Sequence, residues 1–155
     1  MARTSAGILL WRRGDAGREV LLGHMGGPFW ARKDDGAWSL PKGEHGPDEE
    51  PEAVARREFE EELGSPVPTG ELLPLGEHRV TSGKVLAVWA VQGDLDAGTC
   101  VSNTFELEWP PRSGRMQEFP EIDRAAWFGL DDARTKLVKG QVPFLDRLLE
   151  ALPAR

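Results

Sequence analysis

The sequence has almost none of the cysteine that small extracellular proteins rely on. Cys100 is the single cysteine in 155 residues, so no disulfide can form within the chain and no cysteine-cluster zinc site is possible. The 18 glycines and 12 prolines make up a smaller share than low-complexity chains contain. A chain of this length can bury a hydrophobic core of its own. We therefore expect one globular domain over residues 1–155.

Long hydrophobic runs are also missing. No apolar stretch approaches the roughly 20 residues that a transmembrane helix needs. The first residues, Met1-Ala2-Arg3-Thr4, do not begin like a signal peptide. These features predict a soluble, cytoplasmic protein with no membrane partner.

Basic residues are in deficit, with 19 Lys and Arg against 26 Asp and Glu and a formal net charge of −7. Binding to long DNA or RNA depends on basic surfaces, so a long nucleic acid is not an expected partner. Nine of the acidic residues but only two basic ones fall within residues 44–62. If this acidic segment handles an anionic substrate, it needs a divalent cation as intermediary. The alternative is a solvated acidic helix face.

Hydrophobic periodicity and turn residues predict the secondary structure. Strands are predicted at residues 5–11, 19–24, 37–40, 72–77, 85–91, 105–109 and 125–128. The main helix is predicted to begin with Asp48 as its N-cap and Pro51 in its first turn, and to end at Gly64. Shorter helices are predicted at residues 131–138 and 143–152. This order favours an α/β fold in which a mixed β-sheet lies between helices, an α/β/α sandwich.

Three glutamates of the main helix share one face. Glu58, Glu61 and Glu62 stand at i, i+3 and i+4, which places their side chains together at 3.6 residues per turn. A neighbouring apolar stripe that can pack on a sheet is formed by Ala55, Phe59 and Leu63. Carboxylate ligands suit Mg²⁺ or Mn²⁺. An ion pair between Arg57 and Glu61 at i+4 would instead favour a helix face without metal.

Residues 43–65, GEHGPDEEPEAVARREFEEELGS, resemble the Nudix box, G-x5-E-x7-R-E-U-x-E-E-x-G-U with U a bulky apolar residue. The eight matching positions are Gly43, Glu49, Arg57, Glu58, Phe59, Glu61, Glu62 and Gly64. Ser65 departs from the final apolar position, which weakens one packing contact and touches no ligand. Weaker likeness in the flanking segments extends the resemblance from about residue 5 to residue 149.

The resemblance implies a Nudix-type fold and hydrolysis of a diphosphate linked to another moiety, usually a nucleoside, with Mg²⁺ or Mn²⁺ as cofactor. By position, Glu58, Glu61 and Glu62 match the metal-binding glutamates, and Glu58 matches a residue that is the general base in some members. Arg57 matches the arginine that orients a box glutamate, and Gly43 matches a residue whose carbonyl often contacts the metal. The implied catalytic residues are Glu58, Arg57 and Glu61.

Many members of the family add one glutamate from a late loop, six residues before a tryptophan. Glu121 stands six residues before Trp127 and is the predicted additional metal ligand. Glu118 is the competing candidate, and either residue could be a solvated loop acid.

Candidates for substrate contact come from loops outside the helix. Four cations could hold phosphates, and the alternative for each is an ordinary surface residue: Lys42, Lys84, Arg112 and Arg115. Six tryptophans stand in a chain without tyrosine. Trp30 lies in a predicted loop rich in glycine and proline, and Trp109 directly precedes Pro110-Pro111, so either could stack on a base. Residues 102–112 are interpreted as the element that sets specificity.

Among Nudix subgroups, the chain is most similar to hydrolases of diadenosine polyphosphates, so diadenosine tetraphosphate is the leading predicted substrate. A nucleoside triphosphate pyrophosphatase that sanitises the nucleotide pool is the first alternative. The second is a Nudix module that senses a nucleotide without cleaving it. We expect a monomer or a homodimer.

Overall fold

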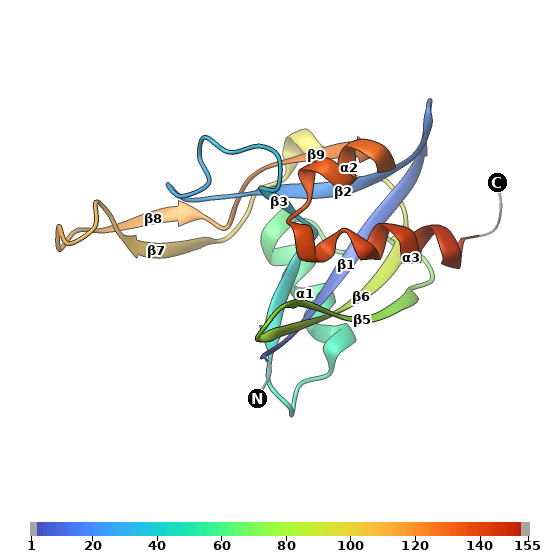
Figure 1. Ribbon diagram of the computed structural model, residues 1–155, viewed down its shortest axis with the longest axis horizontal. Helices are drawn as coiled ribbons and strands as arrows, with labels where there is room; N and C mark the ends of the chain where they lie inside the picture. The colour runs from blue at the N-terminus through green and yellow to red at the C-terminus, as the bar shows by residue number, and fades with distance from the viewer. Residues whose placement is uncertain (1–2, 153–155) are drawn as a thin grey trace.

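A seven-stranded mixed sheet forms the centre of the protein in a computed structural model that describes residues 3–152 (Figure 1). Its strands are β1 (Arg3–Gly14), β2 (Gly17–Met25), β3 (Trp38–Ser39), β4 (Lys42–His45), β5 (Leu73–Thr81), β6 (Lys84–Gln92) and β9 (Ile122–Gly129). Strands β1 and β6 run parallel, whereas the other neighbouring strands are antiparallel. The predicted mixed sheet is therefore confirmed.

The two strands of the first hairpin, β1 and β2, pair near the turn and then diverge. Strand β2 pairs with β1 only near the turn, from Trp11 opposite Val20 to Gly14 opposite Gly17. Where the two strands diverge, β3 pairs with β2 and β4 pairs with β1, so that Gly43 lies opposite Ala6. Strand β4 was not predicted, because four residues with a glycine among them carry no hydrophobic periodicity. This strand leads directly into the main helix.

Helices cover both faces of the sheet. Helix α1 (Pro51–Leu63) covers one face of the sheet and buries Val54, Ala55, Phe59 and Leu63 there. The β1 side chains that point to this face are Ala6, Ile8 and Leu10. Helix α3 (Pro143–Ala151) buries Phe144, Leu145 and Leu148 against the other face, with Leu9 and Trp11. Alternate residues of β1 thus serve the two layers, as the period of a strand requires. This arrangement is the predicted α/β/α fold. No helix within residues 3–152 is long and apolar enough to cross a bilayer.

The ends of the helices agree with the sequence only in part. Gly64 ends α1 in the left-handed conformation, with φ 76°, as glycine at this position permits. The predicted N-cap is wrong, because Glu50 rather than Asp48 occupies it, without a side-chain capping hydrogen bond. Helix α2 (Leu130–Lys136) is shorter than predicted, since the Val138 N–H donates to the carbonyl of Trp38 in β3.

A second, two-stranded sheet extends away from the body of the molecule (Figure 1). Strand β7 (Thr104–Glu108) shows the predicted alternation, with Phe105 and Leu107 half-buried between exposed glutamates. Its partner β8 (Met116–Pro120) was not predicted, because only its last residues, Phe119 and Pro120, are half-buried. Short 3-10 turns at Ala97–Thr99 and Lys139–Gln141 complete the described structure.

Candidate active site

The face of α1 that carries Glu58, Glu61 and Glu62 is fixed by the buried residues beside it. Phe59 and Leu63 are essentially inaccessible to solvent and lock the helix rotation about its own axis. The three glutamates are consequently held half-buried at the margin of the sheet. The side chain of Glu58 keeps 19% of its surface exposed, so it is shielded from water but still reachable.

Gly43 forms the wall against which Glu58 packs. A Cβ atom at residue 43 would overlap the Glu58 side chain, including its carboxylate. The absence of a side chain in β4 therefore lets the carboxylate lie directly against the backbone of the strand. The first and the sixteenth residue of the box are in this way brought together in space.

Arg57 links Glu58 to the loop that precedes the helix. Its guanidinium nitrogens lie 3.6 Å from Glu58 Oε2 and 3.4 Å from Glu49 Oε2. The Gly46 N–H donates to Glu49 Oε1 at 2.8 Å, and this hydrogen bond, with Arg57, lowers the pKa of Glu49. Among residues 3–152, the ion pairs of Arg57 include no pair with Glu61, so the i+4 alternative is not what the structure contains.

Glu62 is the most strongly perturbed carboxylate of the site. The pKa of Glu62 is raised to about 8, mainly by burial, with the neighbouring charges of Glu58 and Glu121 contributing to the rise. Lys42 opposes this rise through its positive charge and through a hydrogen bond from its backbone N–H. Burial, with the charges of Glu61 and Glu121, also raises the pKa of Glu58. Carboxylates that lie close together with too little positive charge near them have raised pKa values, because their ionised forms repel one another.

The structure brings Glu121 rather than Glu118 to this cluster. The Glu121 N–H donates to the carbonyl of Asn103, whose own N–H donates to the carbonyl of Glu61 on α1. On the other side, the Gly26 N–H donates to the carbonyl of Glu121. The negative charge of Glu121 affects both Glu58 and Glu62. Glu118 and Glu121 are both exposed, but Glu118, on β8, is not among the charges that shift either pKa.

The chemistry of these residues fits a divalent cation. Glu61 Oε2 is buried and has no hydrogen-bond partner, an unfavourable state for a carboxylate oxygen unless a cation compensates it. Within the described part of the chain, no three acidic, histidine or cysteine side chains are already arranged as a metal-binding group. Without a cation between them, like charges repel one another. The candidate ligands therefore lie close together without forming a ligand shell.

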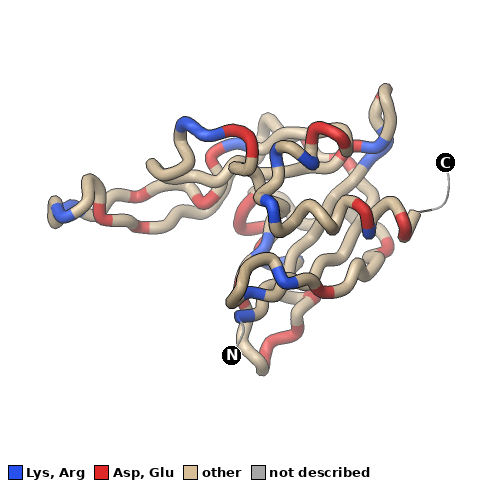
Figure 2. The backbone as a smooth tube through the Cα atoms, in the orientation of Figure 1, with Lys and Arg blue, Asp and Glu red and all other residues tan. Residues whose placement is uncertain are grey.

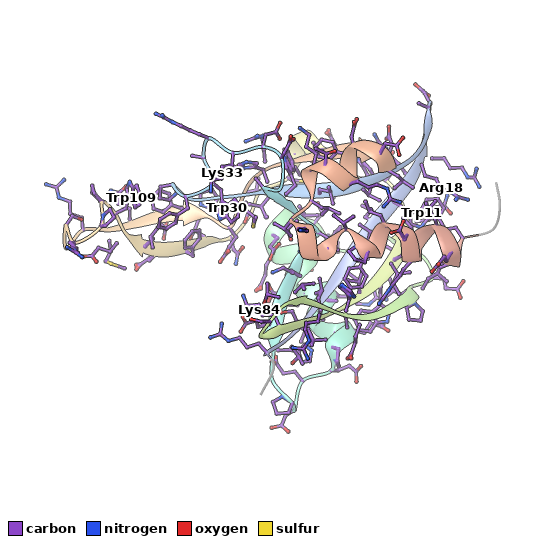
Figure 3. All side chains as sticks on the ribbon, viewed as in Figure 1. Trp11, Arg18, Trp30, Lys33, Lys84 and Trp109 are labelled. Atoms are coloured by element: carbon purple, nitrogen blue, oxygen red, sulfur yellow. The ribbon has the colours of Figure 1, made fainter. Side chains whose placement is uncertain are left out.

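The proposed substrate contacts are dispersed. Lys42 lies at the site, beside Glu62, whereas Lys84 pairs with Glu44 at 3.8 Å. Trp30 is half-buried and packs against the core cluster on the α3 side of the sheet, with Lys33 Nζ 5.2 Å from its ring centroid (Figure 3). Trp109 packs edge-on against Phe29, with ring centroids 5.4 Å apart.

Arg112 and Arg115 are exposed at the tip of the β7–β8 hairpin. Figure 2 shows this basic tip at the end of the molecule remote from the main sheet. The structure does not bring these two arginines to the glutamates of α1 within one chain.

Two positioning residues escaped the sequence analysis. Asn103 connects the late loop to α1 through its backbone, as described above. His24, fully buried, has Nδ1 2.9 Å from Asp123 Oδ1 and Nε2 2.6 Å from the carbonyl of Lys33. It thereby ties the loop that carries Trp30 to β9. Asp123 lies 99 residues from His24 in the sequence, so no local pattern could reveal the pair.

Comparisons with known proteins agree with this geometry. A family model described as the NUDIX domain matches residues 1–148. No curated protein matches the sequence at a significant level. Among the many solved structures that resemble the fold are three described below, each at under 25% identity, which makes them evidence of fold alone.

The first of these structures is the C. elegans Ap4A hydrolase in a binary complex, with 20% identity, a TM-score of 0.61 and 96% of each chain covered. The Nudix domain of Shewanella oneidensis NrtR, complexed with ADP ribose, has 18% identity and a TM-score of 0.66, covering 99% of this chain and 90% of that one. The Nudix hydrolase RenU from M. smegmatis has 23% identity and a TM-score of 0.58, with 98% and 89% covered. Because the family model spans nearly the whole chain and the box residues meet at one site, the chain belongs to the Nudix family.

Proposed function

We propose that this protein hydrolyses the P–O–P linkage of a diadenosine polyphosphate, with diadenosine tetraphosphate as the leading substrate and Mg²⁺ or Mn²⁺ as cofactor. Water attacks one phosphorus atom, a new P–O bond forms, and the bridging oxygen leaves with the other phosphate. For diadenosine tetraphosphate the products are AMP and ATP. The two hydrogens of the water end on the new phosphate oxygen and on solvent or a carboxylate.

The observation that carries the proposal is the environment of the box glutamates. Glu58 packs against Gly43, Glu61 has a buried oxygen without a partner, and Glu62 has a pKa of about 8. A cluster of half-buried carboxylates that repel one another is costly for a purely structural helix. The cost is compensated when a divalent cation and an anionic substrate bind there.

Glu58, Glu61, Glu62, Glu121 and the carbonyl of Gly43 are the groups that would hold the cation. When bound, the cation polarises a phosphate oxygen and lowers the pKa of a coordinated water. Glu58 has a raised pKa and a partly solvent-exposed side chain, and both properties suit it to take a proton from the attacking water. Arg57 orients Glu58 through their ion pair, and Lys42 offers a cation to the substrate phosphates.

The choice of a dinucleotide rests on the resemblance in sequence to hydrolases of diadenosine polyphosphates. The structure adds one exposed aromatic surface, on the hairpin that β7 and β8 form. The aromatic pair of Phe29 and Trp109 lies along this hairpin, beyond the strand that leads to Glu121. Phe29 is 60% exposed and so remains available to a flat ligand.

Product analysis tests the proposal. The protein is incubated with Mg²⁺ and, separately, diadenosine tetraphosphate, canonical and oxidised nucleoside triphosphates, and ADP ribose, with Glu62→Gln as the control. AMP plus ATP from the dinucleotide, absent with the variant, is the expected result.

The other outcomes overturn the proposed substrate in distinct ways. Monophosphate and pyrophosphate from a triphosphate identify a pool-sanitising pyrophosphatase instead. Tight binding of ADP ribose or another nucleotide without turnover identifies a sensing module. The second outcome is included because the NrtR Nudix domain, which shares the fold, was crystallised with ADP ribose.

A further inference from the structure

Strand β9 contains one additional residue close to its start, beside the late loop that carries Glu121. In the pairing of β2 with β9, His24 lies opposite Arg124, whereas the next residue of β2 lies opposite Ile122. Asp123 is therefore the additional residue of β9 at this point, and the register shifts there as in a β-bulge. A bulge redirects the backbone and the side chains around it, and this one lies two residues from Glu121.

A buried histidine holds the additional residue in place. His24 is fully inaccessible to solvent, and its Nδ1 lies 2.9 Å from Asp123 Oδ1. Its Nε2 lies 2.6 Å from the carbonyl oxygen of Lys33. Both ring nitrogens are engaged, so the ring cannot rotate without breaking one of the two contacts. Asp123 also pairs with Arg124 at 3.4 Å, but that side chain is exposed, so His24 is the stronger restraint.

The chain that follows His24 holds the backbone of Glu121 directly. The Gly26 N–H donates to the Glu121 carbonyl at 2.9 Å. A Cβ atom on Gly26 would overlap the carbonyl oxygen of Pro120, so the two backbones are in direct contact. On the other side, the Glu121 N–H donates to the Asn103 carbonyl at 2.9 Å. Glu121 is thus held between two segments, and His24 fixes one of them.

We propose that His24 and Asp123 form a positioning pair that holds Glu121 in the metal site. The charge of Glu121 acts on Glu58 and Glu62, so its carboxylate lies near the box glutamates. A movement of the bulge is passed to Glu121, because a single residue separates it from Asp123. Metal ligands commonly depend in this way on hydrogen-bonded partners that do not touch the ion. The inference rests on the proposed function, in which Glu121 is a ligand of the cation.

Binding of Mn²⁺ to the full chain without substrate tests the inference. Electron paramagnetic resonance measures the free ion and so gives the Kd, at a temperature at which melting curves show each variant to be folded. Asp123→Ala removes the oxygen that faces His24 Nδ1 and should raise the Kd by about tenfold. Asp123→Asn keeps an oxygen acceptor at this position and should bind Mn²⁺ more tightly than Asp123→Ala. His24→Gln removes the contact from the other side and should resemble Asp123→Ala.

A double variant distinguishes positioning from a general loss of stability. If Asp123 acts through Glu121, then Asp123→Ala should change the Kd little in a protein that already carries Glu121→Gln. A merely structural role would weaken binding by the same factor in both backgrounds.

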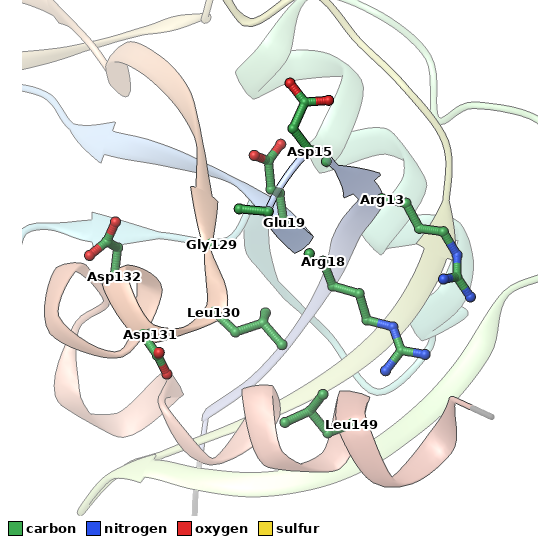
Figure 4. A pocket seen from close by; sticks show the side chains of 12 residues that line it. Arg13, Asp15, Arg18, Glu19, Gly129, Leu130, Asp131, Asp132 and Leu149 are labelled. Carbon is green, nitrogen blue, oxygen red and sulfur yellow. The ribbon is translucent and has the colours of Figure 1, made fainter. Parts of the chain in front are cut away.

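A carboxylate at the other end of β2 provides the matched control. Glu19 pairs with Arg12 at 2.9 Å, and its side chain is 26% exposed, against 29% for Asp123. It lies opposite Gly129 of β9 and lines a cleft at the closed end of the β1–β2 hairpin, away from Glu121 (Figure 4). Glu19→Ala should therefore bind Mn²⁺ like the wild type.

The inference is overturned if Asp123→Ala binds Mn²⁺ like the wild type, or if Glu19→Ala loses as much affinity. It is also overturned if the losses from Asp123→Ala and Glu121→Gln multiply in the double variant. Each of these outcomes leaves the proposed hydrolysis intact, since the wild type still binds the ion. A wild-type protein that binds no Mn²⁺ overturns this inference together with the proposed metal-dependent function.

Discussion

The carboxylate of Glu58 lies against the backbone of Gly43, at a point where any side chain on residue 43 would overlap it. Gly43 belongs to the β-strand and Glu58 to the helix that follows, so this contact sets the distance between the two elements. A glycine and a glutamate fifteen residues apart are thus parts of one feature. The position of the carboxylate depends on the shape of the strand as well as on its own helix.

Replacing Gly43 with alanine should reduce activity far more than stability. The new Cβ displaces the Glu58 side chain, and a misplacement of about 1 Å can cost about a hundredfold in rate. The fold should persist, because the displaced group is a flexible side chain at the margin of the sheet. Steady-state kinetics and thermal melting measure the two effects. Gly83→Ala is the control, since a Cβ there meets open space, and it should leave kcat/KM unchanged.

Adjacent arginines on α1 should respond differently to the same substitution. Arg57→Gln breaks the ion pairs with Glu58 and Glu49 and should lower kcat/KM by about tenfold or more. Arg56→Gln breaks only an exposed pair with Glu52 on the same helix and should leave the rate within about twofold. Equal rates for the two variants would show that Arg57 does not position Glu58.

The metal-free protein should lose stability as the pH rises from about 4.5 to about 8. The pKa of Glu62 is raised from 4.5 to about 8 in the folded state, mainly by burial, so folding favours the protonated acid. The stability that this proton supplies is complete below the unfolded pKa and is lost as the pH passes through the folded pKa. Melting temperatures measured with a chelator across this range should fall more steeply for the wild type than for Glu62→Gln. Parallel curves would contradict the prediction.

Magnesium should stabilise the wild type, because a ligand that binds only the folded state adds about 2.7 kcal/mol at one hundred times its Kd. Glu121→Gln should weaken this stabilisation, because its charge acts directly on Glu58 and Glu62. Glu118→Gln is the matched control on the exposed hairpin and should melt like the wild type with Mg²⁺. A loss confined to the Glu118 variant would reverse the assignment of the late-loop ligand.

Phosphate contact should depend on Lys42 and not on the hairpin tip. Lys42→Gln removes the cation beside Glu62 and should raise KM by about tenfold. Replacing Arg112 and Arg115 together with glutamine should leave KM within about twofold, because the tip lies away from the box glutamates. Steady-state kinetics with the substrate identified by product analysis gives the KM of each variant and checks this prediction. A large effect of the tip variant would mean that the hairpin reaches a second copy or bends onto the site.

Most of the main sheet could be predicted from the sequence because its strands carry their own patterns. β1, β2, β5 and β6 are long enough for hydrophobic periodicity and turn residues to mark them. β4 and β8 escaped prediction for the opposite reason. The first is four residues long, and the second is mostly exposed, so their pairing depends on the strands opposite them.

The sequence by itself determined the common face of Glu58, Glu61 and Glu62, because helical spacing and the apolar stripe beside it are local properties. It also determined the end of α1 at Gly64, where only the residue type and its neighbours matter. Tertiary structure decided which residues from other segments contact these glutamates and Arg57. It brought Glu121 rather than Glu118 to the cluster, paired Arg57 with Glu49 and Glu58, and carried the tip arginines away. These relationships depend on backbone hydrogen bonds and strand pairings between segments that are distant in sequence, and no local pattern encodes them.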